Sequence, residues 1–486
     1  MAKSLKDIYD ETVKQHRDCM EVKNPEKLDE VIEQYNVLLN QVHNEDTLLF
    51  HLATGFHQKG WNGLSIWMYQ CLTEKYKDNA ELWCNLGSCY KGEHKDEKAR
   101  ECWEKAIALD PRPEYFVNMS TLYVNQGNPE PGIQYALKAI EADPNNIKAH
   151  WNYAMLLLEA ARWKDGFREY DTGILTKDRP DKQYSDKPIP YYAGQDLTNK
   201  TIVIYGEQGL GDEIMCVSGL EKFVKLYPGM TVILDVHERL ENTYKRTFPG
   251  LPVYCTRKDL NTIPEWANQY SIDYRIAMGS LFRWVGIEQR EAYLKPDLSL
   301  VEKMRERLKA AGPGPYIGIS WAAGSKTTHS HERSFKLTPL APILEQKATF
   351  ISLQYHKEAR EKTEAHFKNT GIQIHHWPDV VEAWLEDGVK SPGFDYDHTL
   401  ALLCALDLIV VPNTTAVHAC GALGIKCISL TPDAHAWRYS KYFHESQMPF
   451  YKDHVRLIRE NGDWDKAIAL AAEEVKKLSN KRNDDV

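Results

Sequence analysis

The residues best suited to chemistry stand in one short stretch, Gly206-Glu-Gln-Gly-Leu-Gly-Asp-Glu213. The apolar run Thr201–Tyr205 comes directly before it, and a segment with helical character, from Ile214 to Leu226, comes directly after it. Glycines let a backbone approach a ligand closely, and the start of a helix offers N–H donors without partners. A strand, a glycine-rich turn and a helix in this order are typical of a phosphate site.

The side chains inside this stretch divide between binding and proton transfer. Gly209 and Gly211 are predicted to line the phosphate site. Asp212 and Glu213 place carboxylates where one of them could take a proton from an acceptor group. Asp212 also suits a structural role, as an N-cap that satisfies backbone N–H groups at the start of the helix.

The elements that must position these residues follow one another in a regular order from residue 201 onward. Strand-like runs alternate with amphipathic segments, which indicates a parallel sheet. A break at Ala311-Gly-Pro-Gly-Pro315 divides the region in two, and a second strand, turn and helix spans Leu406 to Gly424. Two Rossmann-like halves would leave a ligand cleft at the carboxyl ends of their strands. The predicted strands include Thr201–Tyr205, Thr231–Val236, Val253–Cys255, Tyr316–Trp321, Thr349–Leu353, Ile372–His375, Leu406–Val411 and Lys426–Leu430.

The first third of the chain repeats itself with a period of about 34 residues, the length of a tetratricopeptide repeat. One unit matches the pattern at Trp83-x-x-Leu86-Gly87-x-x-Tyr90 and continues with Ala99, Trp103, Ala106 and Pro111. Small residues let paired helices approach closely, and the large aromatic residues fill the seams between them. Trp67, Trp103, Trp151 and Trp163 are therefore predicted to be core residues.

Stacked repeats form an α-solenoid with a concave face, which usually binds a peptide or another protein. A short array could equally serve only to buttress the domain that follows. Both interpretations of the repeats stay open at this point.

Composition narrows the classes of function. The 486 residues carry 60 basic and 69 acidic side chains, a net charge of −9, which argues against a dedicated nucleic-acid binder. No segment has the length of a signal peptide core or of a membrane span. The ten cysteines form no Cys-x-x-Cys pair, so we expect reduced thiols in a cytoplasmic protein.

A polar, proline-bearing stretch without apolar periodicity marks the domain junction. The predicted organisation is a helical repeat domain at 1–176, a linker at 177–200, an N-terminal Rossmann-like half at 201–311, and a C-terminal Rossmann-like half with a C-terminal helix at 312–486.

Residues 200–475 resemble the heptosyltransferase-like glycosyltransferases, in particular those preceded by tetratricopeptide repeats. The resemblance implies the GT-B architecture and inverting transfer from a nucleotide-activated sugar, with no cofactor and no metal. It places the acceptor in the N-terminal half and the nucleotide sugar in the C-terminal half. The matching blocks are Gly206–Glu213, Ser280–Arg283 with Ala292–Leu294, Gly318–Gly324 with Arg333-Ser334, Ile351–Gln354, Asp397–Leu400, Leu406–Gly424, and Ala436–Tyr439 with Met448–Tyr451.

Within this resemblance, Asp212 occupies the position of the general base, and Glu213 is the second candidate. Arg333 and Ser334 match a pair that faces the phosphates. Arg333 is preferred to Lys326 on the same loop because a guanidinium can meet phosphate oxygens with two donors. Solvation at the surface is the simpler role for Lys326.

The charge that develops on the leaving nucleoside diphosphate needs an offset, which the helix start at Thr414 and Thr415 could supply. Asn413 stands where the family usually has an aspartate; it could still cap the helix, and it removes a negative charge. His418 matches the family histidine one turn into the helix, with a satisfied core histidine as the alternative. A metal at His329-Ser-His331-Glu332 is disfavoured, because no complementary ligand cluster occurs elsewhere in the sequence.

The resulting prediction is a cytoplasmic glycosyltransferase in which the repeats position the acceptor or a protein partner. A saccharide, a protein and a modified nucleic acid all remain open as acceptors. Two alternatives belong to other classes, a repeat-based scaffold that has lost activity and a nucleotide-sugar epimerase with the same fold.

Overall fold

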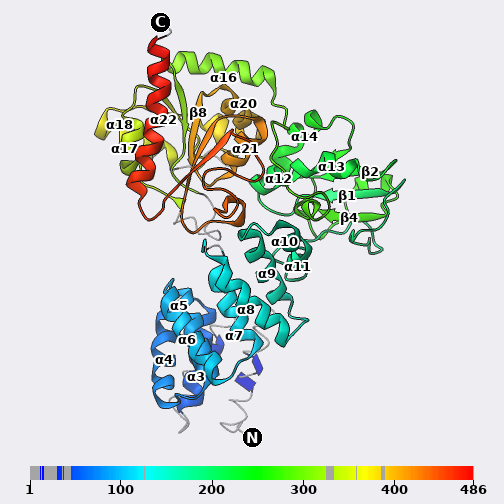
Figure 1. Ribbon diagram of the computed structural model, residues 1–486, viewed down its shortest axis with the longest axis vertical. Coiled ribbons are helices and arrows are strands. Elements are labelled where there is room, and N and C mark those ends of the chain that lie inside the picture. The colour runs from blue at the N-terminus through cyan, green and yellow to red at the C-terminus, as the bar shows by residue number, and fades with distance from the viewer. Residues whose placement is uncertain are drawn as a thin grey trace. The chain divides into compact units, whose positions relative to one another are not determined.

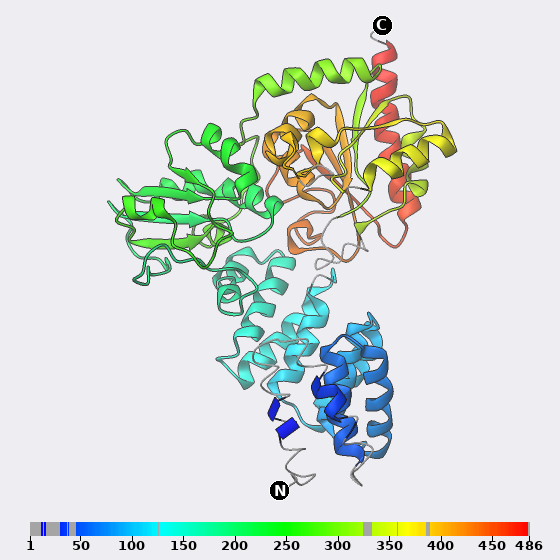
Figure 2. The ribbon, with the colours of Figure 1, turned by 180° about the vertical axis from the view of Figure 1, so that it is seen from behind.

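The computed structural model describes residues 11–12, 14–15, 30–35, 37, 45–124, 126–323, 333–356, 358–384 and 389–484 (Figures 1 and 2). The chain forms two compact units. The first comprises Met1–Val124 with Asn128–Tyr153, and the second comprises Asn125–Gly127 with Ala154–Val486.

The first unit consists of helices that pack in consecutive pairs, as the repeat pattern predicts. Its core takes in the buried aromatic and aliphatic residues of successive helices, from Leu48 to Leu122. The helices are α3 (Glu45–Gln58), α4 (Asn62–Lys75), α5 (Ala80–Gly92), α6 (Asp96–Leu109), α7 (Pro113–Tyr123), α8 (Pro129–Ala142) and the start of α9 (Ile147–Glu159).

One contact shows why the repeat needs a glycine in α5. The indole of Trp103 lies over Gly87 and donates a hydrogen bond from Nε1 to the Cys84 carbonyl at 3.0 Å. A methyl group at Gly87 would lie 2.6 Å from Trp103 Nε1. Trp67 differs from the prediction, because its side chain is 60% exposed on the outer side of α4. The periodic pattern places Trp67 on the helix, but the next helix pair does not cover this face.

The second unit begins with the last repeat helices and continues into a four-stranded parallel sheet with the order β3-β2-β1-β4. The strands are β1 (Thr201–Tyr205), β2 (Thr231–Asp235), β3 (Val253–Tyr254) and β4 (Tyr274–Ala277). The accompanying helices are α10 (Trp163–Glu169), α11 (Thr172–Leu175), α12 (Leu210–Cys216), α13 (Leu220–Val224), α14 (Glu241–Thr247) and α15 (Phe282–Val285). The single helix expected from Ile214 to Leu226 is interrupted by a 3₁₀ turn at Val217–Gly219.

Residues 177–200, expected as a linker, pack onto this sheet. Tyr184 and Ile189 belong to the same buried cluster as Tyr205 of β1. The Tyr192 amide donates to the Arg275 carbonyl at 2.9 Å, which ties the segment to β4. Aromatic side chains spaced between prolines and charged residues form this contact, so the polar composition of the segment conceals it.

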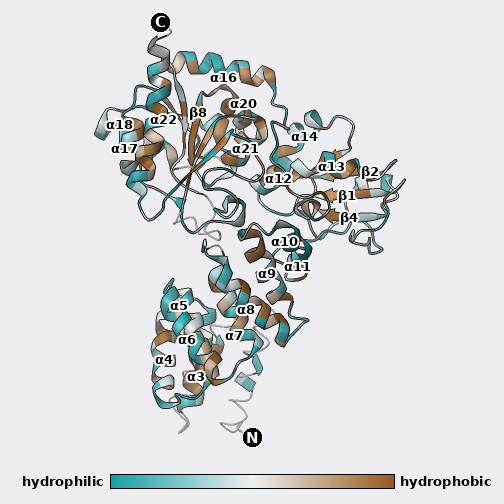
Figure 3. Cartoon of the chain, viewed as in Figure 1, coloured by the Kyte–Doolittle hydropathy of each residue, from teal (hydrophilic) through white to brown (hydrophobic). Residues whose placement is uncertain are grey.

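A second parallel sheet of six strands follows, with the order β10-β9-β8-β5-β6-β7. Its strands are β5 (Tyr316–Ile319), β6 (Thr349–Ser352), β7 (Ile374–His376), β8 (Leu408–Pro412), β9 (Cys427–Thr431) and β10 (Val455–Arg459). The helices around it are α16 (Leu298–Ala311), α17 (Ala341–Leu344), α18 (Ala359–Thr370), α19 (Pro378–Val381), α20 (Asp397–Ala405), α21 (Thr415–Leu423) and α22 (Trp464–Asp484). Hydrophobic residues concentrate on β8 and on α20 and α21 (Figure 3).

Ion pairs and hydrogen bonds join the two sheets' domains within this unit. Arg246 of α14 donates to both carboxylate oxygens of Asp397, and Thr243 donates to the same carboxylate at 2.6 Å. Arg239 donates to the carbonyls of Gly393 and Phe394 at 3.0 and 2.8 Å. These bonds hold α14 and the turn before it against the start of α20 and the residues that precede it.

The predicted fold class, an α-solenoid followed by two Rossmann-like halves, is confirmed. Strands β4 and β10 were not anticipated from the sequence. Among the described helices, none combines the length and apolar character that crossing a bilayer requires. The described cysteines are all free thiols.

Candidate active site

The loop after β1 brings the N-terminal half into contact with α21. Helix α12 begins at Leu210, and Gly209 precedes it in an extended conformation without a side-chain cap. A methyl group at Gly211 would lie 3.1 Å from both the Cα of Thr415 and the Cδ2 of His418. The two strand-turn-helix segments predicted as binding elements therefore meet at their helix starts.

Asp212, the predicted base, forms an ion pair across this contact with Arg438. The Nε of Arg438 donates to Asp212 Oδ1 at 2.8 Å, and Nη2 donates to the same oxygen. The two side chains are 19% and 17% exposed, so the pair is largely shielded from water without being sealed off. Burial lowers the pKa of Arg438, but the charge of Asp212, together with smaller contributions from Tyr439, Tyr170 and Cys216, more than offsets this and the pKa ends above its usual value.

Glu213, the second candidate base, points the other way, into the N-terminal half. Its Oε1 accepts from the His237 amide at 2.9 Å, and its Oε2 lies 3.0 Å from the Nε of Arg257. Burial raises the pKa of Glu213 to about 7, while the positive charge of Arg257 opposes the rise. Only Asp212 of the two carboxylates thus lies at the contact with α21.

The start of α21 has donors that no described group satisfies. Thr414 is the N-cap residue, makes no side-chain cap bond, and has a buried Oγ1 without a partner among the described atoms. Asn413 does not cap the helix as suggested. Its Oδ1 accepts from Ser429 at 2.7 Å and Thr431 at 3.0 Å, and its buried Nδ2 is likewise unpartnered in the described structure. An uncapped helix start with two orphaned donors is suited to an anion.

Arg333 lies at the same helix start. Its Nη1 donates to the Asn413 carbonyl at 2.6 Å. Ser334, next to it, accepts from the Ala323 amide at 3.1 Å. Lys326 lies outside the described residues, as does the His329–Glu332 segment considered for a metal.

His418 is enclosed by two tyrosines. Its Nδ1 lies 3.0 Å from the Tyr451 hydroxyl, and its Nε2 lies 3.1 Å from the Tyr439 hydroxyl. Burial, with a smaller contribution from Arg438, lowers the pKa of His418 well below its usual value, so the ring is neutral. This geometry favours the satisfied core histidine over a direct contact with phosphate.

A second set of residues, not foreseen from the sequence, holds the loop that leads to Asp212. Arg179 is fully buried, lies over the ring of Tyr170 at 4.0 Å, and donates from Nη2 to Glu207 Oε1 at 2.8 Å. Gln208 donates to the Tyr170 hydroxyl at 2.6 Å, and Arg257 donates to the Gln208 carbonyl at 2.9 Å. We call these bonds the loop clamp. Arg179 is a single arginine in a polar stretch of the sequence, so no local pattern could have predicted the loop clamp.

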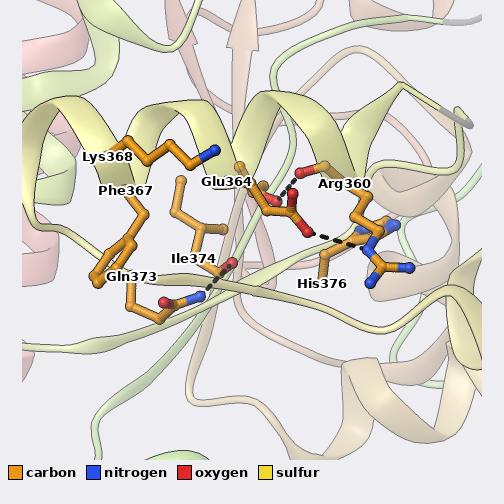
Figure 4. A pocket seen from close by; sticks show the side chains of 8 residues that line it. Arg360, Glu364, Phe367, Lys368, Gln373, Ile374 and His376 are labelled. Atoms are coloured by element: carbon orange, nitrogen blue, oxygen red, sulfur yellow. Dashed lines mark hydrogen bonds and ion pairs between the residues drawn. The ribbon is translucent and has the colours of Figure 1, made fainter.

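The described cavities lie elsewhere. One of about 270 Å³ opens between α18 and β7, where Arg360 pairs with Glu364 at 3.1 Å and Phe367 covers one end (Figure 4). Another, of about 620 Å³, lies in the first unit around Tyr76 and Arg112. Neither contains a residue predicted for binding or catalysis.

Comparison with known proteins supports the repeats directly. Two family models described as tetratricopeptide repeat match residues 80–113 and 113–146. Protein FlbA of Caulobacter vibrioides is 29% identical over 300 residues, which cover 58% of this chain and 48% of that protein. The chain therefore spans about half the length of this curated relative.

Solved structures show more distant similarity. A family 9 glycosyl transferase from Veillonella parvula DSM 2008 is 12% identical, with 60% of this chain and 98% of that chain covered and a TM-score of 0.41. MamA from Desulfovibrio magneticus RS-1 is 15% identical, with 37% and 99% covered and a TM-score of 0.30. Similarity at this level does not establish an activity.

Proposed function

We propose that the chain is a glycosyltransferase that moves a sugar from a nucleoside-diphosphate sugar to an acceptor hydroxyl, with inversion and without a metal. The observation that carries this proposal is the meeting of Asp212 with the uncapped start of α21. A carboxylate on one side and unsatisfied donors on the other are what a displacement between an alcohol and a diphosphate requires.

The donor diphosphate would bind at the start of α21. The backbone amides of the first turn, the Thr414 hydroxyl and the Asn413 amide would donate to its oxygens. The guanidinium of Arg333, held beside Asn413, would add a charge that strengthens as the leaving group develops. These groups supply the positive potential within the protein, so the proposed transfer needs no metal ion.

Asp212 would act from the opposite side. It would accept the proton of the acceptor hydroxyl as the new glycosidic bond forms, and the bond from the sugar to the diphosphate would break on the far face. Attack opposite the leaving group inverts the anomeric centre. Gly209 and Gly211 would leave room for the sugar and the diphosphate along the loop, because neither carries a side chain.

The acceptor would approach from the N-terminal half, and the repeats would position the acceptor or a partner. Residues 80–146 form tetratricopeptide repeats, which supports a protein or peptide on that unit. The acceptor itself could be a saccharide, a protein or a modified nucleic acid.

The test begins with a thermal-shift panel of nucleotide sugars and nucleoside diphosphates, since a ligand of the native state raises the melting temperature. Release of nucleoside diphosphate is then measured with and without candidate acceptors for wild type and Asp212→Asn. Release that requires an acceptor and falls at least about a hundredfold in Asp212→Asn supports the proposal. Conversion of the nucleotide sugar to its epimer without any acceptor indicates an epimerase, and binding without turnover indicates a scaffold.

A further inference from the structure

We propose that Arg438 changes partners during the reaction: it pairs with Asp212 in the free protein and moves to the diphosphate when the donor binds. The exchange adds a second cation to the leaving group and releases the base in the same step. This inference rests on the proposed function and adds to it a residue and an order of events.

The ion pair joins the two halves of the proposed site. Asp212 comes from α12, and Arg438 from the 3₁₀ turn Trp437–Tyr439 of the other half. Both donors of Arg438 go to a single oxygen, Oδ1, at the contact between α12 and α21. The guanidinium therefore already lies beside the place where the diphosphate would bind.

A cation at the place that the Arg438 guanidinium occupies is electrostatically unfavourable unless an anion lies beside it. The start of a helix carries a partial positive charge, and Arg333 bonds at the same helix start. Arg438 pairs with the carboxylate of Asp212, next to Gly211, which packs against Thr415 at this helix end. A nucleoside diphosphate brings more negative charge than that carboxylate, so it would compete effectively for Arg438.

The chain around Arg438 allows its side chain to move while the backbone stays fixed. Trp437 on one side is 3% exposed and packs edge-on against Trp163 and Phe450. Tyr439 on the other side is bonded to His418 at 3.1 Å. A change of side-chain torsions alone would carry the guanidinium from Asp212 toward Thr414.

The exchange also makes the carboxylate oxygen of Asp212 available to the acceptor. In the free protein, two N–H groups of Arg438 bond to Asp212 Oδ1, so an acceptor hydroxyl would have to compete with them for this oxygen. Departure of Arg438 would free Oδ1 only when a donor is in place. Proton transfer would then be confined to the donor complex.

The test measures nucleoside-diphosphate affinity by titration calorimetry for wild type, Asp212→Asn, Arg438→Gln and the double variant. Asp212→Asn leaves Arg438 without its competing partner, so we expect affinity to increase roughly tenfold. Arg438→Gln should weaken binding by roughly tenfold, and the double variant should bind like Arg438→Gln. Arg438→Lys, which keeps the charge, should fall between wild type and Arg438→Gln.

Glu221→Gln is the matched control, because it removes one negative charge from the same half, from a carboxylate that pairs with Arg290 at 2.7 Å. Its affinity should equal that of wild type. Unchanged or weaker binding in Asp212→Asn overturns the exchange while leaving the nucleotide site intact. Failure of every nucleoside diphosphate to bind wild type overturns the proposed function, and the exchange with it.

Discussion

Gly211 of α12 lies against His418 of α21, and an added methyl group would come within 3.1 Å of the histidine ring. It would also come within 3.1 Å of the Thr415 Cα, which is backbone and cannot rotate away. Gly211→Ala should therefore push α12 from α21, destabilise the protein by about 1 to 3 kcal/mol, and weaken nucleoside-diphosphate binding. Chemical unfolding and calorimetry measure the two effects.

Gly250→Ala provides the control for this substitution. It lies in the same half, and a methyl group there would meet nothing within 4 Å. Its affinity should match that of wild type. Full nucleotide affinity in Gly211→Ala would mean that the approach of the two helices does not shape the site.

Glu213 should make stability depend on pH. Its pKa is raised from 4.5 to about 7 in the folded protein, so between these values the folded state binds the proton more strongly than the unfolded state. The free energy of unfolding contributed by this group is largest below the unfolded pKa and declines as pH rises toward 7, by up to about 1.4 kcal/mol per pH unit.

Glu213→Gln removes this titration and keeps an acceptor for the His237 amide. The free energy of unfolding is measured by urea denaturation between pH 5 and 8. Its decline with pH should be less steep in the variant, by an amount that corresponds to nearly one proton. Identical slopes in both proteins would show that the Glu213 carboxyl titrates near its ordinary pKa despite its burial.

The loop clamp should govern the order of the loop before Asp212. Tyr170→Phe removes only the hydroxyl that accepts from Gln208 at 2.6 Å. Loss of one hydrogen bond of about 1 kcal/mol should speed hydrogen exchange of the peptide spanning 206–209 roughly fivefold. Mass spectrometry of exchanged peptides measures this directly.

Tyr192→Phe is the matched control, since Tyr192 is also buried and its hydroxyl bonds only at 2.8 Å to Tyr227, outside the clamp, among the described contacts. Exchange in 206–209 should match wild type there. Equal exchange in Tyr170→Phe and Tyr192→Phe would remove Tyr170 from the clamp.

Periodicity made most of the fold predictable. Short continuous apolar runs, separated by amphipathic segments, predicted β1, β2, β5 and β8. Such runs are typical of strands that are buried on both faces of a sheet. Strand β4 escaped because Arg275 interrupts it; that arginine is buried by pairing with Asp181, an interaction between distant residues. Long-range pairing of this kind leaves no local pattern.

In the candidate site, too, local sequence patterns predicted some features, whereas contacts between distant residues left no pattern. Glycine spacing and the helix start pointed to Gly211 and Thr415, which the structure brings together. The sequence could not predict which of the two adjacent carboxylates points toward α21. Asp212 and Glu213 are consecutive residues of a short helix, so their side chains lie on different faces of it. Arg438 was part of a matched block, yet only its contact with Asp212 reveals a role.

Gly87 and Gly63 test the repeat packing, because they occupy helices of the same unit in opposite surroundings. A methyl group at Gly87 would lie 2.6 Å from the Trp103 indole, whereas one at Gly63 would meet nothing within 4 Å. Gly87→Ala should destabilise the unit by about 1 to 3 kcal/mol. Gly63→Ala should stabilise it by roughly 0.5 to 1 kcal/mol, because alanine loses less backbone entropy in a helix. The unfolding midpoint should shift in opposite directions in the two variants. An unchanged midpoint in Gly87→Ala would contradict the close contact between the Trp103 indole and Gly87.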